Sequence, residues 1–242
     1  FLYSPALGQA DDLFRRAGWD GALRDAPGDY LMLVDANLGF NKVNPYITES
    51  VSYTVDLRDP TRPRATLTLV HWHGGPATGM PCRHEARYDV TYGQMMERCY
   101  WDYVRVYVPG GSRLQEATAH PIPGSLFLTG QPRTGEAEVL TGEDGRTVFA
   151  TFLVLAPGER SETRLVYDLP LESVQLVEGV AQYRFYLQKQ GGTDARAVRI
   201  ALALPPGSQV AAADPPPTAQ EGMVLTYDLR LRTDIELSVV WE

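Results

Sequence analysis

The sequence predicts a mainly β protein: one or two antiparallel β-sandwiches of immunoglobulin-like type, preceded by a short helix. From Gly28 onward, short segments rich in Val, Thr, Tyr and Leu recur along the chain, and Pro, Gly and Asp fill the turns between them. Their close spacing favours antiparallel sandwiches over a parallel sheet with crossover helices. With 242 residues, 44% of them hydrophobic, the chain is long and apolar enough to bury a core.

Residues 1–27 carry the predicted helix. Ser4 and Pro5 are typical of a helix start, apolar residues then recur at helical spacing, and Gly18 is typical of a helix end. Phe1–Tyr3 resembles the end of a strand. We expect residues 1–27 to be a docked strand end and helix, the tail of an upstream region. Because the chain begins with Phe and not Met, it is expected to be a fragment of a longer protein or a processed form.

The alternating and β-branched segments predict twelve strands. They are Tyr30–Val34, Ser50–Leu57, Ala65–His73, Tyr100–Val108, Gly124–Leu128, Ala137–Leu140, Thr147–Leu155, Glu162–Leu169, Gln182–Gln188, Ala197–Leu204, Met223–Leu231 and Ile235–Trp241.

A faint internal repeat divides these strands into two sets. Segments before and after residue 130 align at an offset of about 95 residues, most clearly Val104–Leu114 with Val198–Val210. A boundary in the polar stretch Gly130–Arg146 would give a first sandwich domain at 28–129 and a second at 130–242. Chance alignment of strand–turn patterns is common, so one sandwich or two stays open at this point.

One polar turn stands out. All three asparagines of the protein fall between residues 37 and 44, together with Lys42, one of only two lysines. Asn tolerates left-handed backbone and bonds its own chain, so the turn is expected to be sharply shaped and held by hydrogen bonds to the backbone. A salt bridge from Lys42 to Asp35 is one hypothesis for the lysine, and an unpaired surface lysine is the other.

The two cysteines, Cys82 and Cys99, flank a single loop. A disulfide between them would close about 18 residues, contribute on the order of 3 kcal/mol, and indicate an oxidising compartment. Independent thiols in a reducing cytoplasm are the alternative. After Cys99, Val104, Val106 and Val108 face one side of a strand, and Trp101, Tyr103 and Tyr107 face the other. A disulfide would fold the preceding segment over these aromatic residues, making a second small core rather than an exposed binding ladder.

No catalytic motif is present: neither a nucleophile elbow, a zinc-protease signature, a phosphate loop nor a dinucleotide fingerprint. The candidates for a dispersed acidic site are Asp29, Asp35, Glu49 and Asp102, beside the end of the strand that carries His71 and His73. These two histidines face the same side, and Cys82, His84 and His120 could complete a zinc site with them, but no compact ligand spacing supports this. We therefore predict no catalytic residue, no metal site and no cofactor.

The net charge of −8 and the scattered basic residues exclude nucleic acid as an expected partner. No apolar run is long enough for a membrane helix, so membrane attachment would need an anchor in an upstream segment. The oligomeric state is not predicted. The candidate binding residues form the polar turn and the aromatic strand face. They are Asp35, Asn37, Asn41, Lys42, Asn44, Trp101, Tyr103 and Tyr107.

Four segments in order resemble one known family. Gly28–Lys42 (GDYLMLVDANLGFNK), Cys99–Ser112 (CYWDYVRVYVPGGS), Phe152–Pro170 and Tyr186–Thr193 resemble the C-terminal half of the bacterial "domain of unknown function 4012" proteins. The resemblance implies an N-terminal membrane anchor with the bulk outside the cytoplasm, and it implies no activity. We therefore expect a non-catalytic, extracytoplasmic envelope module that binds a protein or glycan or acts as a scaffold. A hydrolase of envelope polysaccharide is the alternative.

Overall fold

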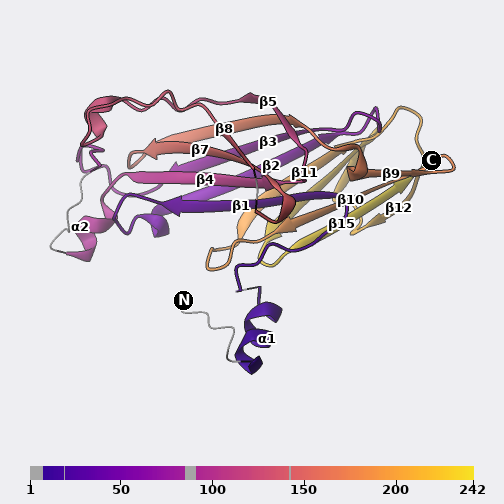
Figure 1. Cartoon of the computed structure of the whole chain (residues 1–242), viewed down its shortest axis with the longest axis horizontal. Helices are drawn as coiled ribbons and strands as arrows, with labels where there is room; N and C mark the ends of the chain where they lie inside the picture. The colour runs from indigo at the N-terminus through magenta and orange to yellow at the C-terminus, as the bar shows by residue number, and fades with distance from the viewer. Residues whose placement is uncertain (1–7, 19, 85–90, 142) are drawn as a thin grey trace.

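Two β-sheets stack on each other and form an elongated sandwich (Figure 1). The computed structural model describes residues 8–18, 20–84, 91–141 and 143–242. The prediction of a mainly β protein is confirmed, because fifteen strands dominate the described residues.

The first sheet, sheet A, has eight strands in the order β12-β15-β10-β1-β4-β7-β6, with β9 also paired to β10. Their bounds are β1 Asp29–Asn37, β4 Tyr100–Val108, β6 Glu138–Thr141, β7 Thr147–Leu155, β9 Val174–Val177, β10 Val180–Gln188, β12 Val210–Asp214 and β15 Ile235–Trp241. The second sheet, sheet B, has seven strands in the order β13-β14-β11-β2-β3-β8-β5. Their bounds are β2 Ile47–Asp56, β3 Arg64–His73, β5 Arg113–Ala117, β8 Arg160–Asp168, β11 Arg196–Ala203, β13 Ala219–Glu221 and β14 Val224–Leu231.

Both sheets are mixed, so the expectation of purely antiparallel sheets is wrong. In the middle of each sheet two strands run parallel: β1 beside β10 in sheet A, and β2 beside β11 in sheet B. Apart from the short strands β12 and β13, which lie between β11 and β14 in the chain, two sets of four strands run from sheet A to two strands of sheet B and back: β1-β2-β3-β4 and β10-β11-β14-β15. Each set starts at the centre of the sandwich. The first strands of the two sets, β1 and β10, and the second strands, β2 and β11, therefore lie side by side and run in the same direction.

Strands from both sides of residue 130, where the sequence suggested a domain boundary, pair with one another in the same sheets. Strands β7 and β8 follow that residue, yet they pair with β4 and β3 of the preceding region. The repeat at an offset of about 95 residues aligned Val104–Leu114 with Val198–Val210, and so strand β4 with β11. These strands lie in different sheets, so that alignment is wrong. The two passes A-B-B-A correspond instead.

The main core lies between the sheets and is built by the inward-facing alternate residues of both, as the period of two in each strand requires. Two smaller apolar clusters cover the outer face of sheet A. One gathers Tyr30, Met32, Tyr107 and Val148, and the other gathers Cys99, Trp101 and Ile122.

Eleven of the twelve predicted strands are present, with bounds that differ by a few residues. The prediction for Gly124–Leu128 is wrong: Gly124–Leu126 is a 3-10 helix that follows Pro123. The sequence missed β5, β9, β12 and β13, which are short and mostly exposed, so their residues show no buried alternation.

The helices are few. Helix α1 (Gly8–Arg16) confirms the predicted N-terminal helix, lies to one side of the sandwich, and is followed by Gly18 with φ of +67° (Figure 1). The sequence missed the short helix α2 (Tyr92–Met96). The other 3-10 turns are Asn44–Tyr46, Glu143–Gly145 and Leu171–Ser173. The predictions for Phe1–Tyr3, Ser4 and Pro5 lie outside the described residues.

Candidate functional site

The predicted disulfide between Cys82 and Cys99 is present. It fastens the segment before β4 to the outer face of sheet A, where the two cysteines pack with Trp101 and Ile122. The bond indicates that the chain folds in an oxidising, extracytoplasmic environment. Within the described residues, no helix is both long and apolar enough to span a bilayer.

The aromatic face of β4 is mostly covered, as the sequence predicted. Trp101 is only 2% exposed and lies under His84, Phe127 and Phe152, with ring centroids 4.8–5.9 Å away. Aromatic rings at such distances and tilts stabilise one another beyond their buried area. Trp101 is therefore part of a second core, and it supports the residues above it.

The polar turn after β1 is held by its asparagines. The side-chain amide of Asn37 donates to the side-chain oxygens of Asn41 and Asn44, at 2.8 Å each, and its own oxygen accepts from the backbone N–H of Gly39 at 2.9 Å. The amide of Asn41 donates to the carbonyl of Cys99 at 2.8 Å. These bonds shape the turn and tie it to the disulfide. The expected hydrogen bonds to the backbone are present, at Gly39 and Cys99, and two further bonds join the asparagine side chains to one another.

That network places Phe40 in an unusual conformation. Its φ is +52°, in the left-handed region that a bulky residue rarely adopts, and its side chain is 59% exposed. Phe40 packs against His84 with ring centroids 5.5 Å apart, and the His84 Nε2 lies 2.9 Å from the carbonyl of Leu38. An exposed aromatic ring on a strained backbone is a feature typical of functional sites.

Phe40 lies at a cavity of about 700 Å³, which we call the Asn-turn pocket. Among the described residues, its lining combines aromatic, amide and cationic groups without an Asp or Glu. The lining residues are Asn37, Leu38, Phe40, Asn41, Lys42, His84, Met95, Phe127, Arg133 and Phe152. Lys42 is exposed, and Arg133 stacks over Phe152 at 5.5 Å from the ring centroid while pairing with Glu138 at 3.3 Å.

The other predicted binding residues lie elsewhere. Tyr103 donates from its hydroxyl to Glu138 at 3.2 Å beside the pocket. Tyr107 is 3% exposed and belongs to the other outer cluster. Asp35 points into the sandwich and pairs with Arg196 at 2.9 Å, so the hypothesis of a Lys42–Asp35 salt bridge is wrong. The structure thus brings together Asn37, Asn41 and Lys42 with Asn44 beside them, above Trp101.

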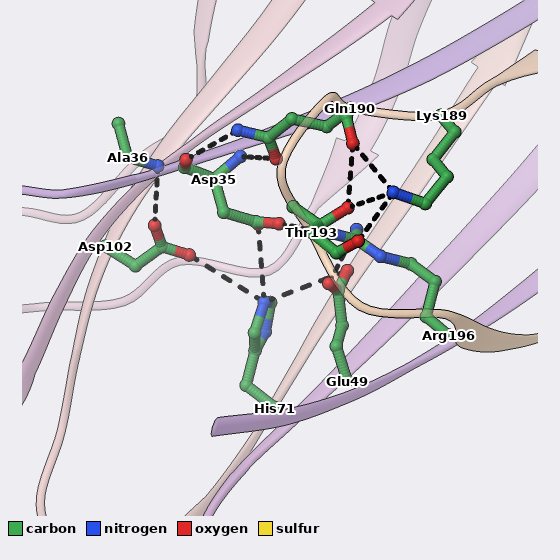
Figure 2. Close-up of polar contacts among 9 residues, drawn as sticks. All are labelled: Asp35, Ala36, Glu49, His71, Asp102, Lys189, Gln190, Thr193 and Arg196. Carbon is green, nitrogen blue, oxygen red and sulfur yellow. Dashed lines mark hydrogen bonds and ion pairs between the residues drawn. The ribbon is translucent and has the colours of Figure 1, made fainter. Parts of the chain in front are cut away.

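A second polar site lies between the sheets. We call it the ionic cluster: Asp35 on β1, Glu49 on β2, His71 on β3, Asp102 on β4 and Arg196 on β11 (Figure 2). Three of the four acids proposed from the sequence for a dispersed site therefore meet, and they meet at His71. Nε2 of His71 lies 3.7 Å from Asp35 Oδ1, 3.9 Å from Glu49 Oε1 and 3.8 Å from Asp102 Oδ2.

Arg196 is the cation of the ionic cluster. Its two terminal nitrogens lie 2.9 Å from Asp35 Oδ2 and 2.6 Å from Glu49 Oε2. The third carboxylate, Asp102, accepts from the backbone N–H of Ala36 at 3.0 Å and has no exposed surface. His71 is 1% exposed. The side chains of Asp35, Glu49 and Arg196 keep exposures of only 8–11%. Charges that are removed from water in this way are costly unless they are compensated.

The pKa values of the cluster follow from burial and crowded negative charge. Burial, with the charge of Asp35 added, raises the pKa of Glu49 to about 7 and holds the pKa of Asp102 well above its ordinary range. Burial opposes ionisation of Asp35, but His71 and Arg196 outweigh it and lower the pKa of that carboxyl. Burial would likewise lower the pKa of His71, yet the surrounding carboxylates raise it.

The loop 188–193 closes over the cluster beside Arg196 (Figure 2). The side chain of Gln190 brackets the backbone of Asp35, donating to its carbonyl at 3.1 Å and accepting from its N–H at 3.0 Å. Lys189 donates to the carbonyls of Gln190 and Thr193 at 3.1 and 2.6 Å. A lysine suits this position because its compact charge on a flexible stem can reach several carbonyl groups at once.

The sequence did not single out the cluster as a unit, although a signal was present. On every contributing strand the ionisable residue continues the inward-facing series of apolar residues at a period of two. Leu67 and Leu69 precede His71 in this way, and Val198 and Ile200 follow Arg196. Which of the five strand ends lie side by side is decided only by the sheet order.

Comparisons with known proteins give no family. No family model matches the chain, and no curated protein matches it. A protein from Legionella pneumophila described as nutrient-binding is similar over 88% of this chain and 71% of its own, at 8% identity and a TM-score of 0.44. The M1 zinc metallopeptidase from Deinococcus radiodurans gives 14% identity and a TM-score of 0.32, over 81% of this chain and 42% of its own. These scores are too low to inform on activity, and the resemblance to the domain of unknown function 4012 stays a prediction.

Proposed function

We propose that this chain is a non-catalytic, extracytoplasmic binding module, built on an immunoglobulin-like sandwich and carried on the cell envelope, whose Asn-turn pocket takes an acidic glycan. The observation that carries the proposal is Phe40. Its ring is 59% exposed at the pocket while its backbone has a φ of +52°. Such a conformation costs on the order of 1 kcal/mol or more for a residue other than Gly, and stability alone would favour Gly there.

The pocket wall suits a sugar. Aromatic faces such as Phe40 and Phe152 offer apolar area for the C–H face of a pyranose ring, and the volume of about 700 Å³ lies in the range of small-molecule sites. The asparagine side chains are largely engaged within the turn, so they hold Phe40 in position more than they contact the ligand. Rigid aromatic groups on a fixed turn lose little entropy on binding.

The charge at the pocket favours an acidic ligand. The protein carries a net charge of −8, yet Lys42 and Arg133 line this cavity and none of its described lining residues is an Asp or Glu; Glu138, which pairs with Arg133, lies beside it. Ammonium and guanidinium groups bind carboxylates through charge-assisted hydrogen bonds. A glycan that contains uronic acids matches both the aromatic wall and these two cations. The oxidising compartment that the disulfide indicates is where envelope glycans occur.

The alternative, a hydrolase of envelope polysaccharide, finds less support in the geometry. The carboxylates that meet, Asp35, Glu49 and Asp102, lie between the sheets, and Asp102 has no exposed surface. A glycosidase places its two carboxyl groups on either side of a bound glycosidic bond. The cluster offers no such access for a sugar chain.

The binding test uses uronic-acid oligosaccharides, for example from polygalacturonate and alginate, with a neutral dextran oligosaccharide for comparison, measured by isothermal titration calorimetry. We expect the acidic sugars to bind and the neutral one to bind at least about tenfold more weakly, and a Phe40→Gly variant to weaken binding of the acidic sugars by about tenfold or more. Because Gly accepts a positive φ without strain, the same variant should unfold at a higher temperature than the wild type. Lost binding together with gained stability cannot come from misfolding.

Matched controls separate the pocket from general surface effects. Trp72 is an exposed aromatic residue on sheet B, 49% exposed, and Trp72→Ala should leave binding unchanged. Lys42→Ala should weaken the acidic sugars, whereas Arg62→Ala, which removes an exposed cation outside the pocket, should not. Equal binding by wild type and Phe40→Gly would contradict the proposal. Release of new reducing ends from the oligosaccharide would favour the hydrolase.

A further inference from the structure

We propose that the ionic cluster between the sheets is a binding site for one divalent metal ion, with Zn²⁺ or Mn²⁺ as the ion and Asp35, His71 and Asp102 as its ligands. One donor atom from each of these residues lies within 4.8 Å of the other two. The atoms are Asp35 Oδ1, His71 Nε2 and Asp102 Oδ2, and Glu49 Oε1 faces the same point, 3.9 Å from His71 Nε2.

In each of the three carboxylates, one oxygen is held by Arg196 or by a backbone N–H, and the other oxygen faces His71. Asp35 and Glu49 pair with Arg196 through Oδ2 and Oε2, and Asp102 accepts the Ala36 N–H through Oδ1. The remaining oxygen of each, which faces His71, is buried and has no hydrogen-bond partner within the described residues. Metal-binding carboxylates are commonly oriented by such outer contacts, which fix the free oxygen toward the ion.

His71 differs from the other three histidines. His73, His84 and His120 each place a ring nitrogen 2.7–2.9 Å from a carbonyl or hydroxyl oxygen. Neither ring nitrogen of His71 has a hydrogen-bond partner in the described part of the chain, although the side chain is 1% exposed. A buried imidazole that faces carboxylate oxygens without a hydrogen bond to any of them is an available metal ligand.

The charge count also fits a dication. Metal binding requires the carboxylates in their ionised form, and three ionised carboxylates facing the one guanidinium of Arg196 would leave two negative charges to be offset. A divalent ion beside a neutral imidazole would bring the net charge of the cluster to zero. A monovalent ion would leave one negative charge. Buried ions are tolerated where they are paired or coordinate a metal.

The distances and donor types select the class of ion. Around a tetrahedral zinc ion with bonds of about 2.1 Å, neighbouring ligand atoms are roughly 3.4 Å apart. The observed separations of 3.7 and 3.8 Å from His71 Nε2 exceed this by a few tenths of an ångström, which side-chain rotation can close. One imidazole with carboxylates suits Zn²⁺ or Mn²⁺, and both cysteines of the chain are in the disulfide. Because the site is enclosed, we expect loading during folding.

The test is metal content. Wild-type protein is unfolded with chelator, refolded with ZnCl₂ or MnCl₂ alone, dialysed, and analysed by inductively coupled plasma mass spectrometry. We expect about one ion per chain and a Tm at least about 5 °C above that of chelator-refolded protein. Asp102→Asn and His71→Gln should retain no ion. His120→Gln and Asp29→Asn, which alter a histidine and a buried carboxylate outside the cluster, should retain it.

Should both cluster variants fail to refold, the wild type alone still decides. Anomalous X-ray scattering at the metal edge from crystals of the refolded protein is expected to place the ion within bonding distance of His71 Nε2. Wild-type protein that refolds without stoichiometric metal in either salt overturns the proposal, as does an ion found elsewhere in the crystal or retained by both Asp102→Asn and His71→Gln.

Discussion

Two buried acidic sites lie on the inward face of the same strand, β1, and they are satisfied in different ways. Asp29 has no exposed surface, and its oxygens accept from the backbone N–H of Tyr30 and from the hydroxyls of Tyr53 and Tyr183. Six residues further on, Asp35 belongs to the ionic cluster, where each carboxylate leaves one oxygen unpaired. Tyrosine hydroxyls and a backbone N–H are enough for the first site, whereas in the second site the free carboxylate oxygens face His71.

The difference is one of charge number. A single carboxylate can take a proton when burial makes ionisation costly, and the pKa of Asp29 is raised to about 6 for that reason, even though Tyr183 and Tyr53 act to lower it. Three carboxylates in one place interact with one another as well, so removing any cation leaves like charges facing each other in a medium of low dielectric. Variants in the ionic cluster and variants around Asp29 both test this difference.

The largest effect is expected from Arg196→Met. The substitution keeps much of the side-chain volume but leaves the carboxylates of Asp35 and Glu49 without their guanidinium partner. Breaking a buried ion pair in this way typically costs about 3–5 kcal/mol of unfolding free energy, to be measured by urea denaturation at pH 8. Arg199 on the same strand pairs with Asp228 at the surface, so Arg199→Met is the matched control and should leave stability unchanged. Equal losses from both variants would mean that the cluster is no special site.

The second effect is a pH dependence from Asp29. Its pKa is about 6 when folded against an ordinary value of 3.8, so the folded state holds the proton more tightly than the unfolded state. The contribution of Asp29 to stability is therefore full below about pH 4 and is lost as the pH rises to 6 and above, by about 3 kcal/mol. The measurement is the difference between wild type and Asp29→Asn in urea denaturation from pH 4 to pH 7. Parallel curves would show that burial does not raise this pKa.

The third effect comes from Tyr183→Phe, which removes one hydroxyl donor to Asp29. A hydrogen bond to an ionised carboxylate is worth about 1.5–3 kcal/mol, so we expect a loss of about 2 kcal/mol at pH 8, where Asp29 is ionised. The loss should shrink at pH 4, and the midpoint of the Asp29 titration, followed by NMR, should move above that of the wild type. A loss of the same size at both pH values would contradict a role in holding the ionised carboxylate.

The smallest effect is expected from Tyr227→Phe, the matched control for Tyr183. Tyr227 is fully buried, and its hydroxyl has no hydrogen-bond partner in the described part of the chain. Removing an unpaired buried hydroxyl relieves its desolvation cost, so the change should be neutral or stabilising by less than about 1 kcal/mol. Thermal melting of the two Tyr→Phe variants side by side checks this. Equal destabilisation by both would show that ring packing, and not hydrogen bonding to Asp29, sets the cost.

The sequence by itself determined the local features of this protein. Alternation of apolar residues identified eleven strands, a pair of cysteines around one loop identified the disulfide, and the crowding of asparagines into residues 37–44 identified a turn held by its own hydrogen bonds. These features depend on interactions between residues close in sequence or on one face of a strand, which a single sequence records directly. The short strands β5, β9, β12 and β13 were missed because their mostly exposed residues show no alternation of apolar and polar side chains.

The tertiary structure alone decided which strands are neighbours. The parallel pairs β1–β10 and β2–β11 bring Arg196 to Asp35 and Glu49 across nearly 150 residues of chain or more, and the order β1–β4 in one sheet and β2–β3 in the other brings Asp102 to His71. The alternation of apolar residues along each strand predicts that these residues face inward, but it does not predict which residues they contact. Sheet order depends on the packing of the whole chain, and so both the ionic cluster and the position of Phe40 at a pocket emerge only when the two sheets are assembled.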